Sequence, residues 1–434
     1  MHSLRRLPQL FAMGLLSSLP MAAERVPAVP RDTPAAPPAQ TAERRRIWSL
    51  RRITSGSSWI PEIDGLRFVA IALVVIFHLS AEVSAKSGIP LIRQSWYSGL
   101  FAFFGRGDIG VRIFFVISGF ILGRPFARHY LLGHARPSLR SYYLRRLTRL
   151  EPPYLINIAV CAIAAAIHSH VPLRTLLLPF AASALYLHGF FFRWSHIINP
   201  VAWTLEMEVQ FYVLVPLLTL VFLVRRPWLR RMLLGTISIL LPAWVLFFAF
   251  GKISGASHFW ATIVWWLQYF LAGMLLSDLY VTDMVRWPVS WRWDVVSGAA
   301  WGILFFASYR LLYIAEPLLI ALAFVAAFRG VLLRRLLATE WLAIVGGMCY
   351  SIYLWHFFII ALVFKASRRI VVSHDLLANF LVQSALILPC ILAFCILYFV
   401  FIERPCMDPA WPQELWAALW SHAKRSAAAQ RSAD

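Results

Sequence analysis

The residues with the clearest chemical potential are Arg67 and His78, which flank ten consecutive apolar residues, Phe68 to Phe77. On an α-helix eleven positions come to almost whole turns, so both side chains project from one face, roughly 16 Å apart along the axis. Asp64 lies one turn before Arg67 on nearly the same face. An arginine at a membrane boundary can extend to water, whereas a histidine deep in hydrocarbon cannot. His78 therefore indicates a functional site, and the structural alternative is a histidine satisfied by a neighbouring helix.

The composition is that of a membrane protein. The chain has 434 residues, of which 60% are hydrophobic and only 14% are charged, and its mean hydropathy is +0.68. Apolar runs recur between short polar or arginine-rich breaks, without the period-two alternation of barrel strands. A soluble protein of this length would not look like this. We predict an all-α fold, a polytopic bundle of membrane-spanning helices.

The formal net charge of +21 would by itself suit a nucleic-acid-binding protein. The arginines, however, are grouped beside the hydrophobic runs, in the clusters 44–52, 140–149, 225–231 and 334–335. This grouping is typical of cytoplasmic loops of membrane proteins and leaves some surplus for an anionic ligand. We therefore expect no nucleic-acid partner. The five cysteines lack metal-ligand spacing, and we predict no metal site.

Hydropathy predicts ten membrane-spanning helices, near 63–83, 108–127, 153–169, 203–224, 232–251, 258–279, 294–312, 316–333, 342–363 and 377–401. Residues 173–192 are interpreted as re-entrant or interfacial, because a further span there would place the arginines of 225–231 outside. With the N-terminus inside, the basic clusters fall in the cytoplasm, and Lys365, Arg368 and Arg369 are the exception.

Three regions follow from this threading. Residues 1–58 are predicted to be a basic, Pro- and Ala-rich cytoplasmic tail, mostly disordered. Residues 59–407 form the membrane domain, and 408–434 form a cytoplasmic C-terminal tail. Residues 1–23 can alternatively be interpreted as a signal peptide. We expect a multi-pass protein of the inner or plasma membrane with both termini in the cytoplasm.

Three ionisable residues from distant parts of the sequence share one expected depth. At 1.5 Å per residue, His78 lies roughly 10 Å below the outer face, Glu208 roughly 8 Å and His356 roughly 9 Å. Such convergence is what a buried site facing the outer side would require.

At the opposite face, Arg67 is expected to meet Arg146 and Arg149. These two arginines share a helix face if their segment is helical, and arginine pairs bind phosphates in bidentate fashion. The alternative for each is ordinary positive-inside charge. Pro152 and Pro153 follow, and we expect them in the first turn of the next span.

A series of six motifs in this order resembles the acyltransferase-3 family of integral membrane acyltransferases. The motifs are Asp64-Gly65-Leu66-Arg67 with His78 (Arg-x10-His); Phe114–Phe120 (FFVISGF); Arg146-Leu147-Thr148-Arg149 with Pro152-Pro153-Tyr154; Trp203-Thr204-Leu205 with Glu208 and Phe211-Tyr212; Tyr350–His356 (YSIYLWH); and Ile402-Glu403-Arg404-Pro405. There are two departures. Arg112 stands where members of the family often carry an acidic residue, and Glu206 is an extra acid beside Glu208. The spacing to Phe211-Tyr212 favours Glu208.

The resemblance implies transfer of an acyl group, most often acetyl, from cytoplasmic acyl-CoA to a hydroxyl of a cell-envelope or exported glycan, either free or as a lipid-linked saccharide. No cofactor is bound permanently, and acyl-CoA is a co-substrate. The expected donor-binding residues are Asp64, Arg67, Arg146 and Arg149. His78 is the natural general base, because burial favours neutral imidazole and the acceptor hydroxyl must lose its proton. Glu208 and His356 are candidates to orient it, whereas Asp64, about 21 Å below it on the same helix, is expected to pair with Arg67.

Four further residues of these motifs are expected at the substrate site: Ser118, Trp203, Tyr212 and Tyr353. Ser118 can be imagined as a covalent nucleophile, but a packing or binding role is favoured because small residues mark helix interfaces in membranes. Tyr212 and Tyr353 can hydrogen-bond an acceptor or merely satisfy the bundle. The competing function is a proton-coupled transporter or flippase of a glycan or lipid precursor, with His78 and Glu208 as a proton relay. It predicts repeat symmetry between the halves, which the sequence does not show.

Overall fold

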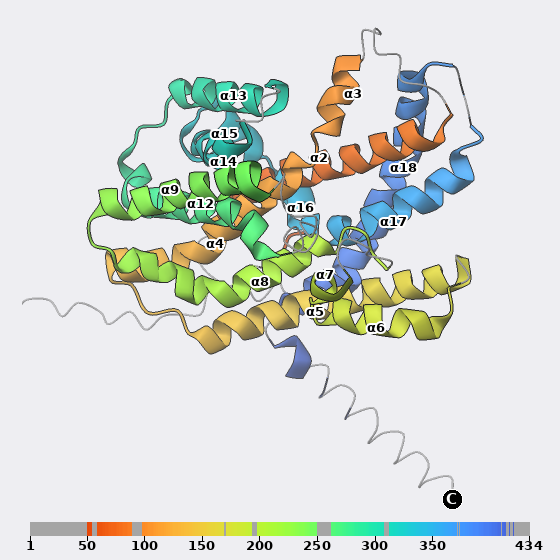
Figure 1. Cartoon of the computed structure of the whole chain (residues 1–434), viewed down its shortest axis with the longest axis horizontal. Coiled ribbons are helices and arrows are strands. Elements are labelled where there is room, and N and C mark those ends of the chain that lie inside the picture. Colours follow the sequence, from red (N-terminus) through yellow and green to blue (C-terminus); the bar gives the residue numbers. More distant parts are fainter. Residues whose placement is uncertain are drawn as a thin grey trace, which may run out of the picture. The chain divides into compact units, whose positions relative to one another are not determined.

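A computed structural model describes residues 50–53, 59–88, 98–168, 171–192, 198–249, 262–307, 312–370, 372, 374–408, 410–413, 416 and 420. All of them belong to one compact unit, residues 47–434. Within these ranges the chain is helical, without a strand, as the composition predicts (Figure 1). The predictions for the tail before residue 50, for a signal peptide and for residues 421–434 lie outside the described residues.

Nine helices in the described part of the chain are long and apolar enough to cross a membrane. The fold is therefore a polytopic all-α membrane bundle, as predicted. The spans are α2 (Pro61–Lys86), α3 and α4 in succession (Ser98–Gly105, Ile109–Leu132), α5 (Leu139–His168), α8 with η1 (Trp203–Leu218, Thr219–Leu223), α9 with η2 (Pro227–Trp244, Val245–Ala249), α12 (Ile263–Thr282), α14 (Leu312–Arg329), α17 (Cys349–Ser367) and α18 with η4 and α19 (Leu376–Tyr398, Phe399–Glu403, Arg404–Cys406).

One predicted span is too short to count among these nine. The run expected at 294–312 forms α13 (Trp291–Phe306), which has 16 residues. At 1.5 Å per residue it rises about 24 Å, less than the roughly 30 Å of a bilayer core. It packs along α14, however, and both termini can lie on one side of the membrane only if α13 crosses as a tenth, short span.

The remaining described helices are short. Residues 173–192 form α6 (Leu173–Ala184) and α7 (His188–Phe192), so the interpretation that this stretch is no full span agrees with its length. Figure 1 shows α6 lying beside α5, with which it packs. The connections near the arginine clusters are η3 (Met284–Arg286), α15 (Leu332–Leu337) and α16 (Glu340–Gly347).

The start of α5 differs from the prediction. Pro152 and Pro153 do not open this helix, because it begins at Leu139 and both prolines lie inside it. Pro152 has no N–H to give to the carbonyl four residues earlier, that of Thr148. The indole of Trp411 donates to this carbonyl at 3.0 Å instead, which lets the helix continue through the proline.

The same compensation occurs in α8. Pro216 leaves the Tyr212 carbonyl without its helical donor, and the hydroxyl of Tyr142 on α5 donates to it at 3.2 Å. A side chain of α5 thus completes the backbone of α8, which fixes the two helices against each other beside the arginine-rich stretch of α5.

Helices α4 and α12 cross in close contact at the centre of the bundle. A Cβ on Gly119 would collide with the backbone of Phe270, and one on Gly273 would collide with the carbonyl of Val116. Only glycine permits this approach. Because Ser118 precedes Gly119, the crossing also sets where the Ser118 side chain lies.

Residues 50–53 pack with the helical domain, although they lie before the predicted boundary at residue 58. Leu50 and Ile53 are partly buried against its core. The carbonyl of Arg51 accepts a hydrogen bond from Arg404 Nε at 3.1 Å. The ordered domain thus extends N-terminal to α2.

Candidate active site

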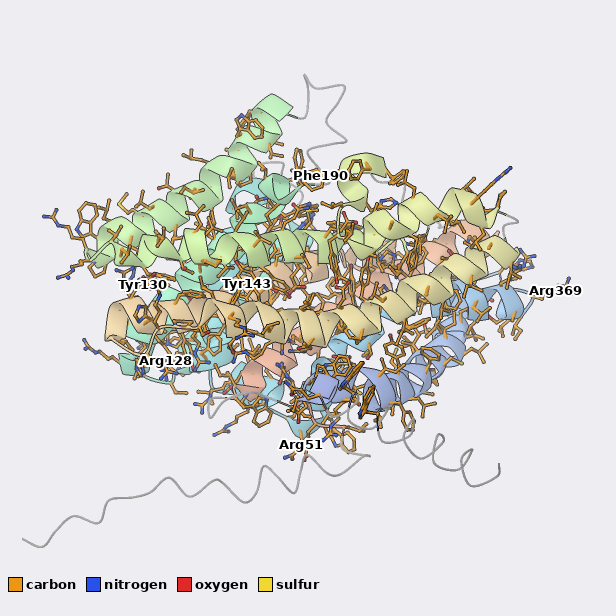
Figure 2. The ribbon with its side chains drawn as sticks, turned by 90° about the horizontal axis from the view of Figure 1, so that it is seen from below. Arg51, Arg128, Tyr130, Tyr143, Phe190 and Arg369 are labelled. Atoms are coloured by element: carbon orange, nitrogen blue, oxygen red, sulfur yellow. The ribbon has the colours of Figure 1, made fainter. Side chains whose placement is uncertain are left out.

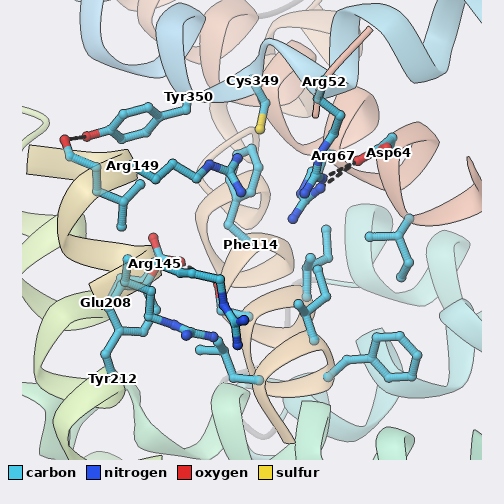
Figure 3. Close-up of a pocket in the computed structure, with 18 of the residues that line it drawn as sticks. Arg52, Asp64, Arg67, Phe114, Arg145, Arg149, Glu208, Tyr212, Cys349 and Tyr350 are labelled. Carbon is cyan, nitrogen blue, oxygen red and sulfur yellow. Dashed lines mark hydrogen bonds and ion pairs between the residues drawn. The ribbon is translucent and has the colours of Figure 1, made fainter. Parts of the chain in front are cut away.

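A cavity of about 500 Å³ lies between α2, α4, α5, α8 and α17 (Figure 3). Seven arginines line it: Arg52, Arg67, Arg124, Arg128, Arg145, Arg146 and Arg149. Among the described lining residues, Asp64 and Glu208 are the two carboxylates opposing them. A cleft lined by one sign of charge attracts ligands of the opposite sign, so the cavity suits an anion.

Asp64 joins two of these arginines. Its Oδ1 accepts from Arg67 at 2.5 Å and from Arg52 at 2.8 Å, and its Oδ2 accepts from the Trp59 indole at 2.8 Å. The expected Asp64–Arg67 pair is therefore present. Burial lowers the pKa of Arg52, Asp64 opposes this shift, and the nearby Arg149 adds to it. One carboxylate shared by two guanidinium groups leaves this corner positively charged.

The early start of α5 carries Arg145, Arg146 and Arg149 on its cavity side. The Arg146 guanidinium lies 3.6 Å from the centre of the Tyr142 ring, and its Nη1 donates to the Tyr142 carbonyl at 2.6 Å. Arg149 extends from α5 toward Arg52 and Arg67 (Figure 3). Arg67, Arg146 and Arg149, the arginines expected to meet, thus line the same cavity.

Glu208 lies in the same cavity, bound to two hydroxyl groups. Its Oε1 accepts from Ser118 of α4 at 2.8 Å and from Tyr212, one turn later on α8, at 2.6 Å. Glu206 is turned away and accepts from the backbone N–H of Gly189 at the start of α7, at 2.8 Å. The geometry thus agrees with the motif spacing in choosing Glu208 for the cavity.

His78 of α2 and His356 of α17 form a pair with ring centroids 5.2 Å apart. His356 is fully buried, and its Nδ1 lies 2.8 Å from the Tyr353 carbonyl and 3.1 Å from that of Ile352. Carbonyl oxygens only accept, so Nδ1 carries the proton and Nε2 keeps its lone pair. Within the described residues, Nε2 has no hydrogen-bond partner.

The three ionisable residues expected to converge therefore do not all meet. His78 and His356 come together, but the hydrogen bonds of Glu208 go to Ser118 and Tyr212 rather than to either histidine. The physical reason is that depth fixes the height of a residue in the membrane and not the direction in which its side chain points.

Tyr353 connects the cavity to the histidine pair. Its side chain lines the cavity, and its ring centroid lies 5.7 Å from that of His356. Its hydroxyl contacts the Thr204 hydroxyl at 2.5 Å and donates to the Val201 carbonyl at 2.7 Å. Neither histidine is among the described lining residues, so the histidine pair lies outside this cavity and next to Tyr353.

One residue expected at the substrate site lies elsewhere, and two residues that line the cavity were not predicted. Trp203 is not among the described lining residues, since its ring packs against Trp266 with centroids 5.0 Å apart. Arg52 and Tyr142 line the cavity but did not stand out in the sequence. Arg52 looked like any basic residue before a span, whereas Tyr142 would follow from Arg146 once a helix starting at Leu139 was recognised.

Arg112 of α4 is paired with two carboxylates. Arg112 pairs with Asp108 at 2.7 Å and with Glu316 of α14 at 2.6 Å, so the departure from the family pattern is compensated by an acid on another helix. Within the described residues, no group of three His, Cys, Asp or Glu side chains is placed to hold a metal ion.

Comparison with known proteins identifies the family. The sequence model of the acyltransferase-3 family, described as an acyltransferase domain, matches residues 60–400. The O-acetyltransferase OatA of Staphylococcus aureus (strain NCTC 8325 / PS 47) is 26% identical over 331 residues, which is 70% of this chain and 51% of that protein. The peptidoglycan O-acetyltransferase OatA of Listeria monocytogenes serovar 1/2a (strain ATCC BAA-679 / EGD-e) is 28% identical over 209 residues, 45% of this chain and 30% of that protein.

This chain thus spans about half the length of the staphylococcal relative and 30% of the length of the listerial one. No solved structure matches it. The motif series, the helical bundle and the family match over residues 60–400 lead to one conclusion. The chain belongs to the acyltransferase-3 family of integral membrane acyltransferases.

Proposed function

We propose that this chain is a membrane O-acyltransferase that moves an acyl group, in the first instance acetyl, from acyl-CoA to a hydroxyl of a cell-envelope or exported glycan. The observation that carries the proposal is the arginine-lined cavity next to a histidine pair, of which His356 is fully buried. The names of the relatives, an O-acetyltransferase and a peptidoglycan O-acetyltransferase, support acetyl as the group and a glycan as the acceptor.

The cavity would hold the anionic end of the donor. Arg67, Arg146 and Arg149 supply charge-assisted hydrogen bonds to phosphate oxygens, and Asp64 positions Arg67. Glu208 would repel a phosphate if it faced one alone. The hydroxyl groups of Ser118 and Tyr212 donate hydrogen bonds to its carboxylate instead. This places both residues at the cavity and supports a binding role for them. The pantetheine arm would then run past Tyr353 toward the histidines.

His78 would act as the general base and His356 would orient it. Because the Nε2 of His356 keeps its lone pair, it can accept an N–H from His78 and leave the other His78 nitrogen free to accept a proton. The acceptor hydroxyl oxygen attacks the thioester carbonyl carbon as His78 takes its proton. The C–O bond forms, the C–S bond breaks, and the departing CoA thiolate receives that proton.

Radiolabelled acetyl-CoA incubated with membranes that contain the chain tests this proposal. We expect label on a glycan, identified by mass spectrometry of surface glycans from cells with and without the gene. His78→Ala should lower transfer by about 10²–10⁴-fold at equal membrane abundance. His168→Ala, at the exposed end of α5, is the matched control and should retain transfer.

Two outcomes would contradict the proposal. Label that remains on CoA with wild-type membranes would favour the transporter or flippase. Transfer by the His78→Ala variant within a few-fold of wild type would remove His78 from the chemistry while leaving the enzyme class intact.

We further propose that the arginine cavity faces the cytoplasm and that both termini lie there, because the largest arginine clusters gather at that end. Figure 2 shows Arg128 and Arg369 at opposite ends of the molecule. In a chain without native cysteines, Ala366→Cys at the exposed end of α17 should react with an impermeant thiol reagent in intact spheroplasts. Ser138→Cys, just before α5, should react only after the membrane is opened. The reverse pattern would invert the direction of transfer.

A further inference from the structure

Arg52 lies outside the stretch that the family model matches, residues 60–400, yet its side chain lines the arginine cavity. Its Nη1 donates to Asp64 at 2.8 Å, and the side chain is only 17% exposed. An arginine removed from water to this degree needs partners for its remaining N–H groups. Asp64 supplies one acceptor for Arg52, and that same oxygen also serves Arg67.

Arg149 approaches the same place from α5. Figure 3 shows it extending across the cavity toward Arg52 and Arg67, and its positive charge acts on Arg52. The Nε atoms of both Arg52 and Arg149 are buried without a hydrogen-bond partner in the described part of the chain. Two like charges with unused N–H groups at one wall of a cavity leave room for an anion between them.

The backbone that carries Arg52 is anchored on both flanks of this residue. The carbonyl of the neighbouring Arg51 accepts a hydrogen bond from Arg404 Nε at 3.1 Å. Leu50 and Ile53 are partly buried against the core. Arg52 is therefore presented by a fixed segment, which lowers the entropy lost when a ligand binds.

We propose that Arg52 and Arg149 form the subsite for a phosphate group of the acyl donor. A residue before the family's domain thereby completes the donor site. The ligand chemistry is a phosphate monoester or a diphosphate, which planar guanidinium groups bind in bidentate fashion. This inference rests on the proposed acyl-CoA donor, and the following experiment separates the two.

Binding is measured by calorimetry on the full chain in lipid nanodiscs, with CoA, 3′-dephospho-CoA and pantetheine as probes. Arg52→Ala should weaken CoA binding about tenfold or more, because charge-assisted hydrogen bonds are lost, and should leave pantetheine binding unchanged. Arg52→Lys should fall between wild type and Arg52→Ala, since a point charge lacks the fork of donors. Loss of the 3′-phosphate from the probe should remove the effect if this phosphate occupies the subsite; otherwise the diphosphate does.

Arg51→Ala is the matched control, because its side chain is exposed and does not line the cavity. We expect it to bind all three probes within about twofold of wild type. Wild-type CoA affinity in Arg52→Ala would overturn the inference. Equal weakening of CoA and pantetheine would also overturn it, because that result indicates a structural role. A wild-type chain that binds none of the probes would contradict the acyl-CoA donor itself.

Discussion

Two groups of arginines lie between helices of this molecule, and their surroundings are opposite. Where α9 meets α12, Arg230 pairs with the fully buried Asp278, and Arg231 pairs with Asp278 at 3.0 Å and with Asp283 at 2.7 Å. Two arginines thus face two carboxylates. In the cavity, seven arginines face two carboxylates, and one of those is bound to hydroxyl groups.

The difference in charge matching indicates different roles, helix packing for the matched group and ligand binding for the unmatched one. Removing one partner from a matched buried ion pair leaves an uncompensated charge, so such a pair joins its helices firmly. An unmatched cluster has the reverse property, because the charge that would complete it has to come from a ligand. The same residue type therefore joins two helices in one place and, in the proposed function, is left to bind an anionic ligand in the other.

The largest effect, on the free energy of unfolding, is expected from a substitution in the matched group of ion pairs. Asp278→Ala would leave Arg230 buried without its carboxylate and should destabilise the chain by about 3–5 kcal/mol. Thermal unfolding of the detergent-solubilised chain measures this loss. Asp283→Ala, whose side chain is 35% exposed, is the control and should cost much less. Equal stability of Asp278→Ala and wild type would show that the pair does not fasten the two helices.

An intermediate effect is expected from the unmatched group, and on binding rather than on folding. Arg149→Ala should weaken acyl-CoA binding by about 1.5–3 kcal/mol. It should leave the unfolding temperature nearly unchanged, because the variant relieves the repulsion of Arg52 but loses the attraction to the buried Glu403. Calorimetry and thermal unfolding on one preparation measure both. Arg140→Ala, exposed on the same helix, should change neither. A destabilised Arg149→Ala chain with normal donor affinity would erase the distinction between the two groups.

The smallest effect is expected from Tyr142, and it tests whether its hydroxyl supports the backbone of α8 or binds the donor. Tyr142→Phe removes the hydroxyl that serves the Tyr212 carbonyl and should destabilise the chain by about 1 kcal/mol. The phenyl ring still lies under Arg146, so donor affinity should hold. Tyr143→Phe is the control, because the carbonyl of Val213 that it contacts faces no proline nitrogen four residues on. A loss of donor affinity in Tyr142→Phe would assign the hydroxyl to binding.

Much of the site could be predicted from the sequence because its parts are periodic. The helical repeat placed Asp64 next to Arg67, and rise per residue brought His78 to the level of His356. Periodicity along one helix says nothing about which way another helix turns its side chains. That is why Glu208, at the expected depth by helix rise, faces Ser118 instead of the histidines.

Two other differences have causes outside any local pattern. The prolines of α5 suggested a helix start, but an indole from Trp411 supplies the hydrogen bond that Pro152 cannot give. Arg52 resembled its basic neighbours, and only its contact with Asp64 distinguishes it from the exposed Arg51. Both features depend on residues far apart in the chain or in space.

The hydrogen bond from Trp411 to Thr148 has a consequence for the order in which the molecule is made. Helix α5 is synthesised early, but the donor for its open carbonyl follows α18, the last span among the described residues. A nascent chain that has not yet released Trp411 from the ribosome therefore holds an incomplete α5. The wall of the cavity reaches its final hydrogen bonding only after Trp411 has left the ribosome, later than all the described spans.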